Sequence, residues 1–286
     1  MDRYLFESFV FGMEDETMSQ SLVVFAHQAK SMVEKEGNSK VTFNYYPQEE
    51  DKLQLVVEAE RKNGEVAVNY LKLHHTSPDV WKLKIIDTLS LHKDCYMASR
   101  EDGSGCIIIR LVNEQVLGDI KSGDIIKAQV VGMAMAIDIF EDEEAYKEKV
   151  PEGKDGQKYL MGDGDIIPAN MIINNNTNLT EEERKEIDHS FDNLVDFKGT
   201  IKQVWKYPLR IFDMDVNNYY MAEVDTEYGN LHIVIPFPMF PEELKGFGAG
   251  NIIAGKLLIS GDVCIDEYEK YAKGITINKN SKAQGK

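Results

Sequence analysis

Histidine, cysteine and carboxylate side chains carry most catalysis and metal binding in proteins, and this chain has few of the first two. Its six histidines show no HxH or HxxxH spacing, and its three cysteines form no CxxC pair. Zinc sites and disulfide frameworks both depend on such patterns. The sequence therefore predicts neither a metal site nor a disulfide framework. The residues concerned are His27, His74, His75, His92, His189 and His232, with Cys95, Cys106 and Cys264.

Two acidic segments resemble ligand loops only in part. The run 213–217 begins like a calcium-binding loop, but Asn218 and Val224 stand where the glycine and the terminal glutamate belong. The segment 162–165 alternates glycine and aspartate without the Lys-Ser/Thr of a phosphate-binding loop, so we expect a turn. The chain also lacks a GxSxG nucleophile elbow. We therefore predict no catalytic residues and no cofactor.

Lysines on one predicted strand form the pattern best suited to binding. Residues 197–206 alternate with period two, which is typical of a half-buried antiparallel strand. This alternation places Lys198, Lys202 and Lys206 on the exposed face and turns Trp205 toward the core. Exposed lysines on a barrel strand can follow a phosphate backbone. The candidate binding residues are Lys198, Lys202, Lys206, Arg210, His232 and Lys256.

The charge of the whole chain opposes a nucleic-acid partner. Lys+Arg 32 against Asp+Glu 49 gives a net charge of −17, which repels polyanions. The acidic stretches 141–144 and 266–269 are suited to a basic partner, whose association they would accelerate. A protein partner is therefore favoured over nucleic acid.

Composition favours a cytoplasmic protein with real cores. The hydrophobic fraction is 43%, and no apolar run approaches the length of a membrane span. The first residues lack a basic flank and a small-residue cleavage site. We expect no membrane association, and at 286 residues the chain has room for two or three domains.

The first 78 residues have the pattern of an α+β unit. We expect a strand at 3–11 and a helix from Thr17 or Ser19 to about Glu36. Strands are expected at 41–46, 53–60 and 66–73. The last two flank Asn63-Gly64, a pair that supplies the positive φ of a tight hairpin turn.

A short β-unit recurs in the rest of the chain. Tyr96-Met97-Ala98, six residues and Gly105 are matched by Tyr220-Met221-Ala222, six residues and Gly229. Downstream, Gly123 answers to Gly250 at the start of an isoleucine-rich run. Such self-similarity predicts two units of like architecture.

The second copy reads as strand, hairpin, a loop that ends in a short helix at 242–245, and a strand opened by Gly250. This order resembles the OB-fold, a five-stranded barrel. Ala128 and Gly255 are small residues at the matching place where a barrel strand would bend. The alternative is a meander of antiparallel strands that forms a sandwich or a split barrel.

The predicted fold class is α+β and mostly β, with five segments. An α+β unit at 1–78 precedes an OB-like antiparallel barrel at 79–140. An acidic linker at 141–196, with a helix that Thr180 and Glu183 would cap, leads to a second OB-like barrel at 197–277. Residues 278–286 are expected to be a flexible tail.

The predicted function is that of a non-catalytic cytoplasmic binding protein whose partner is another protein. One alternative is single-stranded nucleic-acid binding through the lysines of the second barrel. Another is an enzyme or small-ligand sensor with a pocket between the N-terminal unit and the first barrel, since pockets favour domain junctions.

Overall fold

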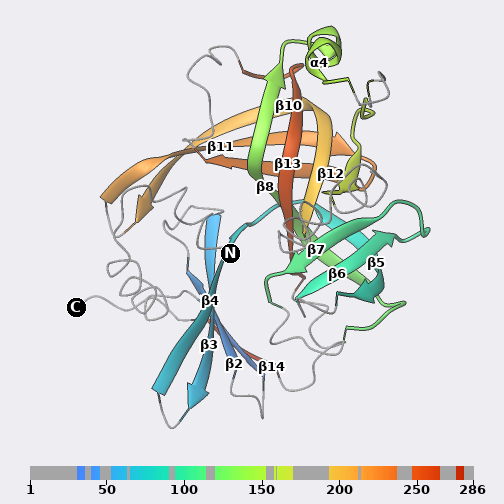
Figure 1. Ribbon diagram of the computed structural model, residues 1–286. Coiled ribbons are helices and arrows are strands. Elements are labelled where there is room, and N and C mark those ends of the chain that lie inside the picture. Colours follow the sequence, from blue (N-terminus) through green and yellow to red (C-terminus); the bar gives the residue numbers. More distant parts are fainter. Residues whose placement is uncertain are drawn as a thin grey trace, which may run out of the picture.

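The structure is a computed structural model, and it is mostly β (Figure 1). It describes residues 31–35, 40–45, 53–62, 65–89, 94–113, 120–152, 158, 160–169, 193–211, 214–236, 247–264 and 275–279. These residues form two sheets and one helix, α4 (Glu143–Lys149). The β-rich character that the sequence predicts is confirmed.

The first sheet has five strands, and each pairs antiparallel with its neighbours. Its order is β14 (Ile275–Lys279), β1 (Ser31–Lys35), β2 (Lys40–Tyr45), β3 (Leu53–Lys62) and β4 (Glu65–His75). The three expected strands are confirmed, and the last two pair as a hairpin, because Lys62 pairs with Glu65. The turn expected at residues 63 and 64 lies outside the described residues.

Two expectations for the ends of this sheet are wrong. Residues 31–35, expected to end a helix, form β1, which is paired on one edge with β2 and on the other with β14. Ladder hydrogen bonds on both edges override the helical periodicity. Asn278 and Lys279 were expected in a tail but belong to β14, so the chain returns to its first sheet. The strand expected at 3–11 and the start of the helix lie outside the described residues.

The second sheet has nine strands, in the order β11-β12-β8-β5-β6-β7-β13-β10-β9. Their bounds are β5 (Val80–Thr88), β6 (Cys95–Arg100), β7 (Ile107–Leu111), β8 (Ile125–Phe140), β9 (Ile166–Pro168), β10 (Leu194–Ile211), β11 (Met214–Thr226), β12 (Gly229–Pro236) and β13 (Ile252–Val263). The helices expected near residues 180 and 242 lie outside the described residues.

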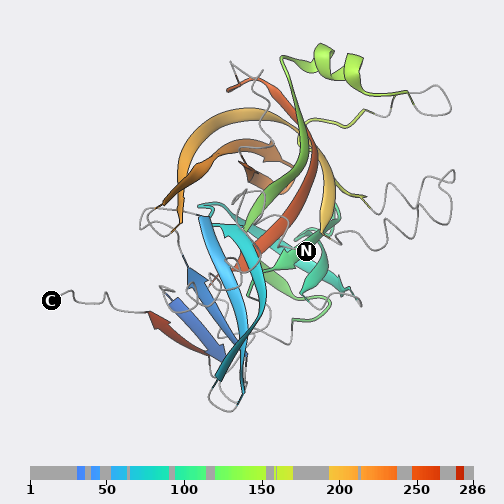
Figure 2. The ribbon, with the colours of Figure 1, turned by 60° about the vertical axis from the view of Figure 1, so that its left-hand side comes forward.

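Strands β8 and β13 pair with each other along almost their whole length and hold this sheet together (Figure 2). β8 also pairs with β5 through residues 125–129 and with β12 through residues 131–133. Some of the β8 residues in each contact also pair with β13. β5 and β12 therefore both lie along the edge of β8 that faces away from β13. β13 likewise pairs with β10 and then, in parallel, with β7.

These pairings close two circuits of five strands that share β8 and β13. One runs β8-β5-β6-β7-β13, and the other runs β13-β10-β11-β12-β8. The pattern is the same in both, and each includes one parallel pair, β7–β13 or β12–β8. Neither circuit closes with the strands of one half of the chain alone.

The register of β8 and β13 has a local two-fold symmetry. If Gly123 is aligned with Gly250 and the alignment is extended, Gly132 corresponds to Ile259, and these two residues are also cross-strand partners. The pairs Met133–Leu258 and Val131–Ser260 exchange under the same correspondence. The symmetry ends at a bulge between Lys256 and Leu257.

One continuous apolar core fills both circuits. The inward positions of the strands are Ile, Val, Leu and aromatic residues, whose branched shapes pack well on a pleated sheet. Fully or almost fully buried members include Trp81, Leu83, Ile107, Ile109, Ile126, Phe197, Ile233, Ile253 and Ile259.

A bulge in β10 reverses the face that its residues present. The register to β11 shifts between Ile201 and Gln203, and Lys202 and Gln203 are both exposed. Beyond the bulge Val204 packs against the core, whereas Trp205 lies against His232 on the other face. The strict alternation expected over 197–206 is therefore wrong after Ile201, because the extra residue changes the phase.

Gly255 is a position where no other residue fits. Its φ is +145°, and a Cβ there would collide with the carbonyl oxygen of Ala136. We expect Gly255→Ala to lower the free energy of unfolding by at least about 3 kcal/mol, since backbone strain and overpacking add. Urea denaturation measures this loss.

Gly250→Ala is the matched control. Gly250 also has a positive φ, +94°, but a Cβ there would meet nothing within 4 Å. It should cost only the conformational strain, about 1 kcal/mol. Equal losses for the two variants would contradict the steric role of Gly255.

Candidate functional site

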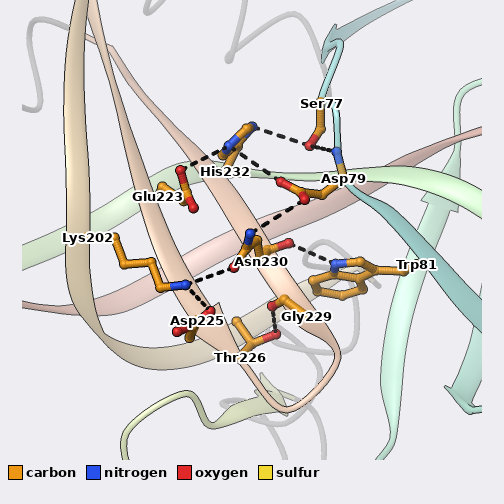
Figure 3. Close-up of polar contacts among 10 residues, drawn as sticks. All are labelled: Ser77, Asp79, Trp81, Lys202, Glu223, Asp225, Thr226, Gly229, Asn230 and His232. Atoms are coloured by element: carbon orange, nitrogen blue, oxygen red, sulfur yellow. Dashed lines mark hydrogen bonds and ion pairs between the residues drawn. The ribbon is translucent and has the colours of Figure 1, made fainter.

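His232 lies at the centre of a buried polar cluster (Figure 3). It sits on β12 and is only 3% exposed. Its Nδ1 lies 3.2 Å from Ser77 Oγ, and its Nε2 lies 3.7 Å from an Asp79 carboxylate oxygen and 3.8 Å from one of Glu223. Ser77 and Asp79 belong to the link between β4 and β5, and Glu223 is the cross-strand partner of His232 on β11.

A serine, a histidine and carboxylates are the residue types of nucleophilic catalysis, but this geometry does not present a nucleophile. Ser77 is fully buried, and its Oγ accepts a hydrogen bond of 3.1 Å from the backbone N–H of Asp79. The distances from Nε2 to the carboxylates exceed hydrogen-bond length. The cluster therefore connects the β4–β5 link to the β11–β12 hairpin through polar contacts.

Asn230 links this polar cluster to the exposed Lys202 (Figure 3). Its side-chain amide approaches Asp79 at 3.5 Å and accepts a hydrogen bond of 3.1 Å from Lys202. Its backbone carbonyl accepts a 2.8 Å bond from the Trp81 indole. Lys202 also pairs with Asp225 at 2.5 Å, and this hydrogen bond is the main cause of its raised pKa. Lys202 is thus engaged within the protein.

The prediction that Lys198 belongs to a row of exposed lysines on β10 is wrong. This side chain is 2% exposed, pairs with Glu143 Oε2 at 2.6 Å and lies 4.9 Å from the centre of the Tyr146 ring. The physical reason is α4, which covers this part of β10 and was not predicted. The stretch 141–144 is therefore not a free acidic loop, since Asp142 caps α4 and Glu143 binds Lys198.

The other predicted binding residues do not converge. Lys256 pairs with Asp196 at 2.7 Å. Lys206 is exposed, with its ammonium 5.7 Å from the centre of the Tyr220 ring. Arg210 lies on β10, and its side chain is outside the described part, as is the acidic stretch 266–269.

The residues that do gather at the surface lie on β5 and β8. We define the β5–β8 face as Val80, Lys82, Lys84, Ile86, Ile125 and Lys127. Val80, Ile86 and Ile125 are 46%, 40% and 37% exposed, and they are three of the four large apolar side chains exposed among the described residues. The sequence carried a signal for this face, because Val80 and Ile86 are out of phase with the buried Trp81, Leu83 and Ile85.

The end of β4 is inserted against the outer side of the second sheet. His74 and His75 are fully buried. His74 Nδ1 lies 3.1 Å from Ser260 Oγ on β13, and the His75 ring packs near Tyr207 and Tyr219 at 6.3 and 6.2 Å between centres. Burial lowers the pKa of His74 from 6.5 to about 3, so the native protein holds this ring neutral.

Within the described part of the chain, no three His, Cys, Asp or Glu side chains form a group suited to a metal ion, and no helix is long and apolar enough to cross a membrane. The three cysteines are free thiols.

A scan of protein-family models finds no match, and searches of curated proteins and of solved structures find none either.

We expect stability to fall as the pH drops below 6.5, because His74 takes up a proton only when the chain unfolds. The loss from this group should be about 2 kcal/mol between pH 7 and pH 5. Urea denaturation of wild type and His74→Asn at both pH values measures it. The variant should lose about 2 kcal/mol less, and parallel losses would contradict the assignment.

The Lys198–Glu143 pair gives a second test. Glu143→Gln leaves a buried ammonium without its carboxylate, and because Glu143 is partly exposed we expect a loss of about 1–2 kcal/mol. Adding Lys198→Met removes the unpaired charge and should recover most of that loss. Thermal unfolding of the single and double variants decides, and a double variant less stable than Glu143→Gln would contradict this account.

Proposed function

We propose that the protein is a non-catalytic binding protein whose partner is another protein. The observation that supports this is the β5–β8 face, where three exposed aliphatic side chains stand among lysines on two paired strands. Exposed apolar surface bordered by polar residues is characteristic of interaction sites. The free thiols agree with a reducing compartment such as the cytoplasm.

We further propose that the nine-stranded sheet consists of two OB-like barrels that exchange a strand. Each circuit has five strands, as an OB barrel has, and β13 or β8 supplies the fifth strand from the other half of the chain. The identical pairing pattern of the two circuits supports this interpretation.

The alternative of nucleic-acid binding depended on a row of exposed lysines in the second barrel, and the structure does not present that row. Lys198 is buried, and Lys202 and Lys256 each bind a carboxylate within the protein. The net charge of the whole chain, −17, also opposes a polyanion. Nucleic acid is therefore an outcome that the experiment must be able to detect.

Site-specific photo-cross-linking in cells tests the proposal. A photoreactive phenylalanine at Ile125 should give protein adducts at a defined mass, since the side chain points outward from the face. The same group at Lys206, which is exposed on β10, is the control and should give no such band. Mass spectrometry identifies the adduct.

Two results would reject the function. Nuclease-sensitive adducts at Ile125 would indicate nucleic acid. Adducts of the same mass from Ile125 and Lys206 would indicate random encounters and not a binding face.

A further inference from the structure

We propose that the polar cluster around His232 binds an arginine side chain from a basic segment of the protein partner. This inference rests on the proposed function and adds the chemistry of the partner. Four residues of the cluster and its border reach the surface, and we call them the acidic site: Asp79, Trp205, Glu223 and Asp225.

The acidic site carries more negative charge than its surroundings neutralise. The side chains of Asp79 and Glu223 are 32% and 20% exposed, and both approach His232 Nε2. Within the part of the chain that the structure describes, neither carboxylate forms an ion pair with a lysine or an arginine. The ammonium of Lys202 is nearby, but Asp225 already binds it.

The pKa of Lys202 shows how these charges are distributed. Its hydrogen bond to Asp225 is the main cause of the raised pKa, and the charges of Glu223 and Asp79 raise it further. One ammonium therefore lies in the field of three carboxylates. Such an excess of negative charge favours a cationic ligand.

The three carboxylates form one surface. The Asn230 amide group approaches Asp79 at 3.5 Å and accepts a hydrogen bond of 3.1 Å from Lys202 (Figure 3). Lys202 in turn pairs with Asp225. Glu223 joins this surface because it and Asp79 approach the same nitrogen of the central histidine. A cation bound here is therefore attracted by all three carboxylates.

The aromatic ring at the site favours a guanidinium over an ammonium. Trp205 is only half-buried, and its ring centre lies 5.8 Å from that of His232. A guanidinium is planar, stacks on aromatic rings and spreads five donors over a fork, whereas an ammonium is a point charge. It can rest on Trp205 while it donates to Glu223 and Asp79, which lie on different elements.

The partner reaches the site with a side chain and does not add a strand to the sheet. Glu223 lies on β11, which pairs with β10 along one edge and with β12 along the other. His232 lies on β12, between β11 and β8. Neither strand has a free edge at this place, so recognition is through side chains.

The acidic site adjoins the β5–β8 face. Asp79 directly precedes Val80, which is 46% exposed. Val80 pairs with Gln129 of β8, and the residue of β8 that pairs with His232 is two positions further along. A segment that lays an aliphatic side chain on Val80 therefore brings its neighbouring side chains to the acidic site. We expect the arginine of the partner to lie close to an aliphatic residue.

Fluorescence anisotropy with designed peptides tests the inference. The probe is a labelled peptide with arginines and valines in a glycine–serine background. Comparison peptides carry lysine, glutamate or citrulline in place of arginine, and citrulline keeps the shape of arginine without its charge. The arginine peptide should bind most tightly, and its affinity should fall as salt is raised. The citrulline and glutamate peptides should bind at least about tenfold more weakly.

Variants locate the binding. Glu223→Gln/Asp225→Asn should weaken the arginine peptide about tenfold, and Trp205→Leu about threefold. Glu144→Gln/Glu148→Gln makes the same change in net charge at exposed positions of α4 and should weaken binding less than about twofold. Equal weakening by both double variants would overturn the proposal, because it would show only the field of the whole protein.

A variant that gains affinity keeps the test decisive if the others unfold. Lys202→Gln removes an ammonium that faces the carboxylates and should tighten the arginine peptide about threefold. Lys206→Gln is the matched control, because it removes the same charge from the opposite side of β10, where Lys206 lies near the Tyr220 ring. It should change the affinity less than about 1.5-fold. Equal effects of the two variants would contradict the assignment.

Other outcomes also overturn the inference. It fails if the lysine or citrulline peptide binds as tightly as the arginine peptide, or if no peptide binds. In each case protein adducts at Ile125 would still support the proposed function. Absence of those adducts would instead count against the proposed function, so the two failures are distinguishable.

Discussion

The pairing of β8 with β13 is the interaction on which the rest of the second sheet depends. Every other strand of the two circuits is joined to this pair directly or through one neighbour. The pair also needs a close approach at its centre, where a Cβ on Gly132 would lie 2.8 Å from Leu257 Cδ1. A glycine at that place leaves room for the buried side chain of Leu257.

The two sheets are connected by buried polar groups at the end of β4 and in the link that follows it. His74 reaches Ser260 on β13, and Ser77 reaches His232 on β12, across the link that leads from β4 to β5. Buried polar groups cost free energy unless they are paired, so these bonds specify one arrangement of the link. The link also positions the β5–β8 face, because β5 begins at Val80, directly after the link.

Local patterns predicted local structure well. The turn signal between the strands at 53–60 and 66–73 predicted a hairpin, and β3 and β4 pair as one. The hairpin expected in the second copy is also present, with Thr226 paired to Gly229. Period-two alternation located the first half of β10. The bulge at Lys202 could not be read from the sequence, because nothing local distinguishes an extra residue from the next step of the alternation. The partners of His232 were missed for another reason. Ser77 and His232 are 155 positions apart, and only the closed topology brings them together.

The circuit that begins at β5 stays open until β13 has been made, and β1 likewise waits for β14. During synthesis on the ribosome, β7 and β8 therefore leave the exit tunnel with strand edges that have no partner for more than a hundred residues. Such edges are prone to pair with other chains. Nascent chains truncated before residue 250 should be the species that chaperones hold, and release should coincide with the emergence of the last strands.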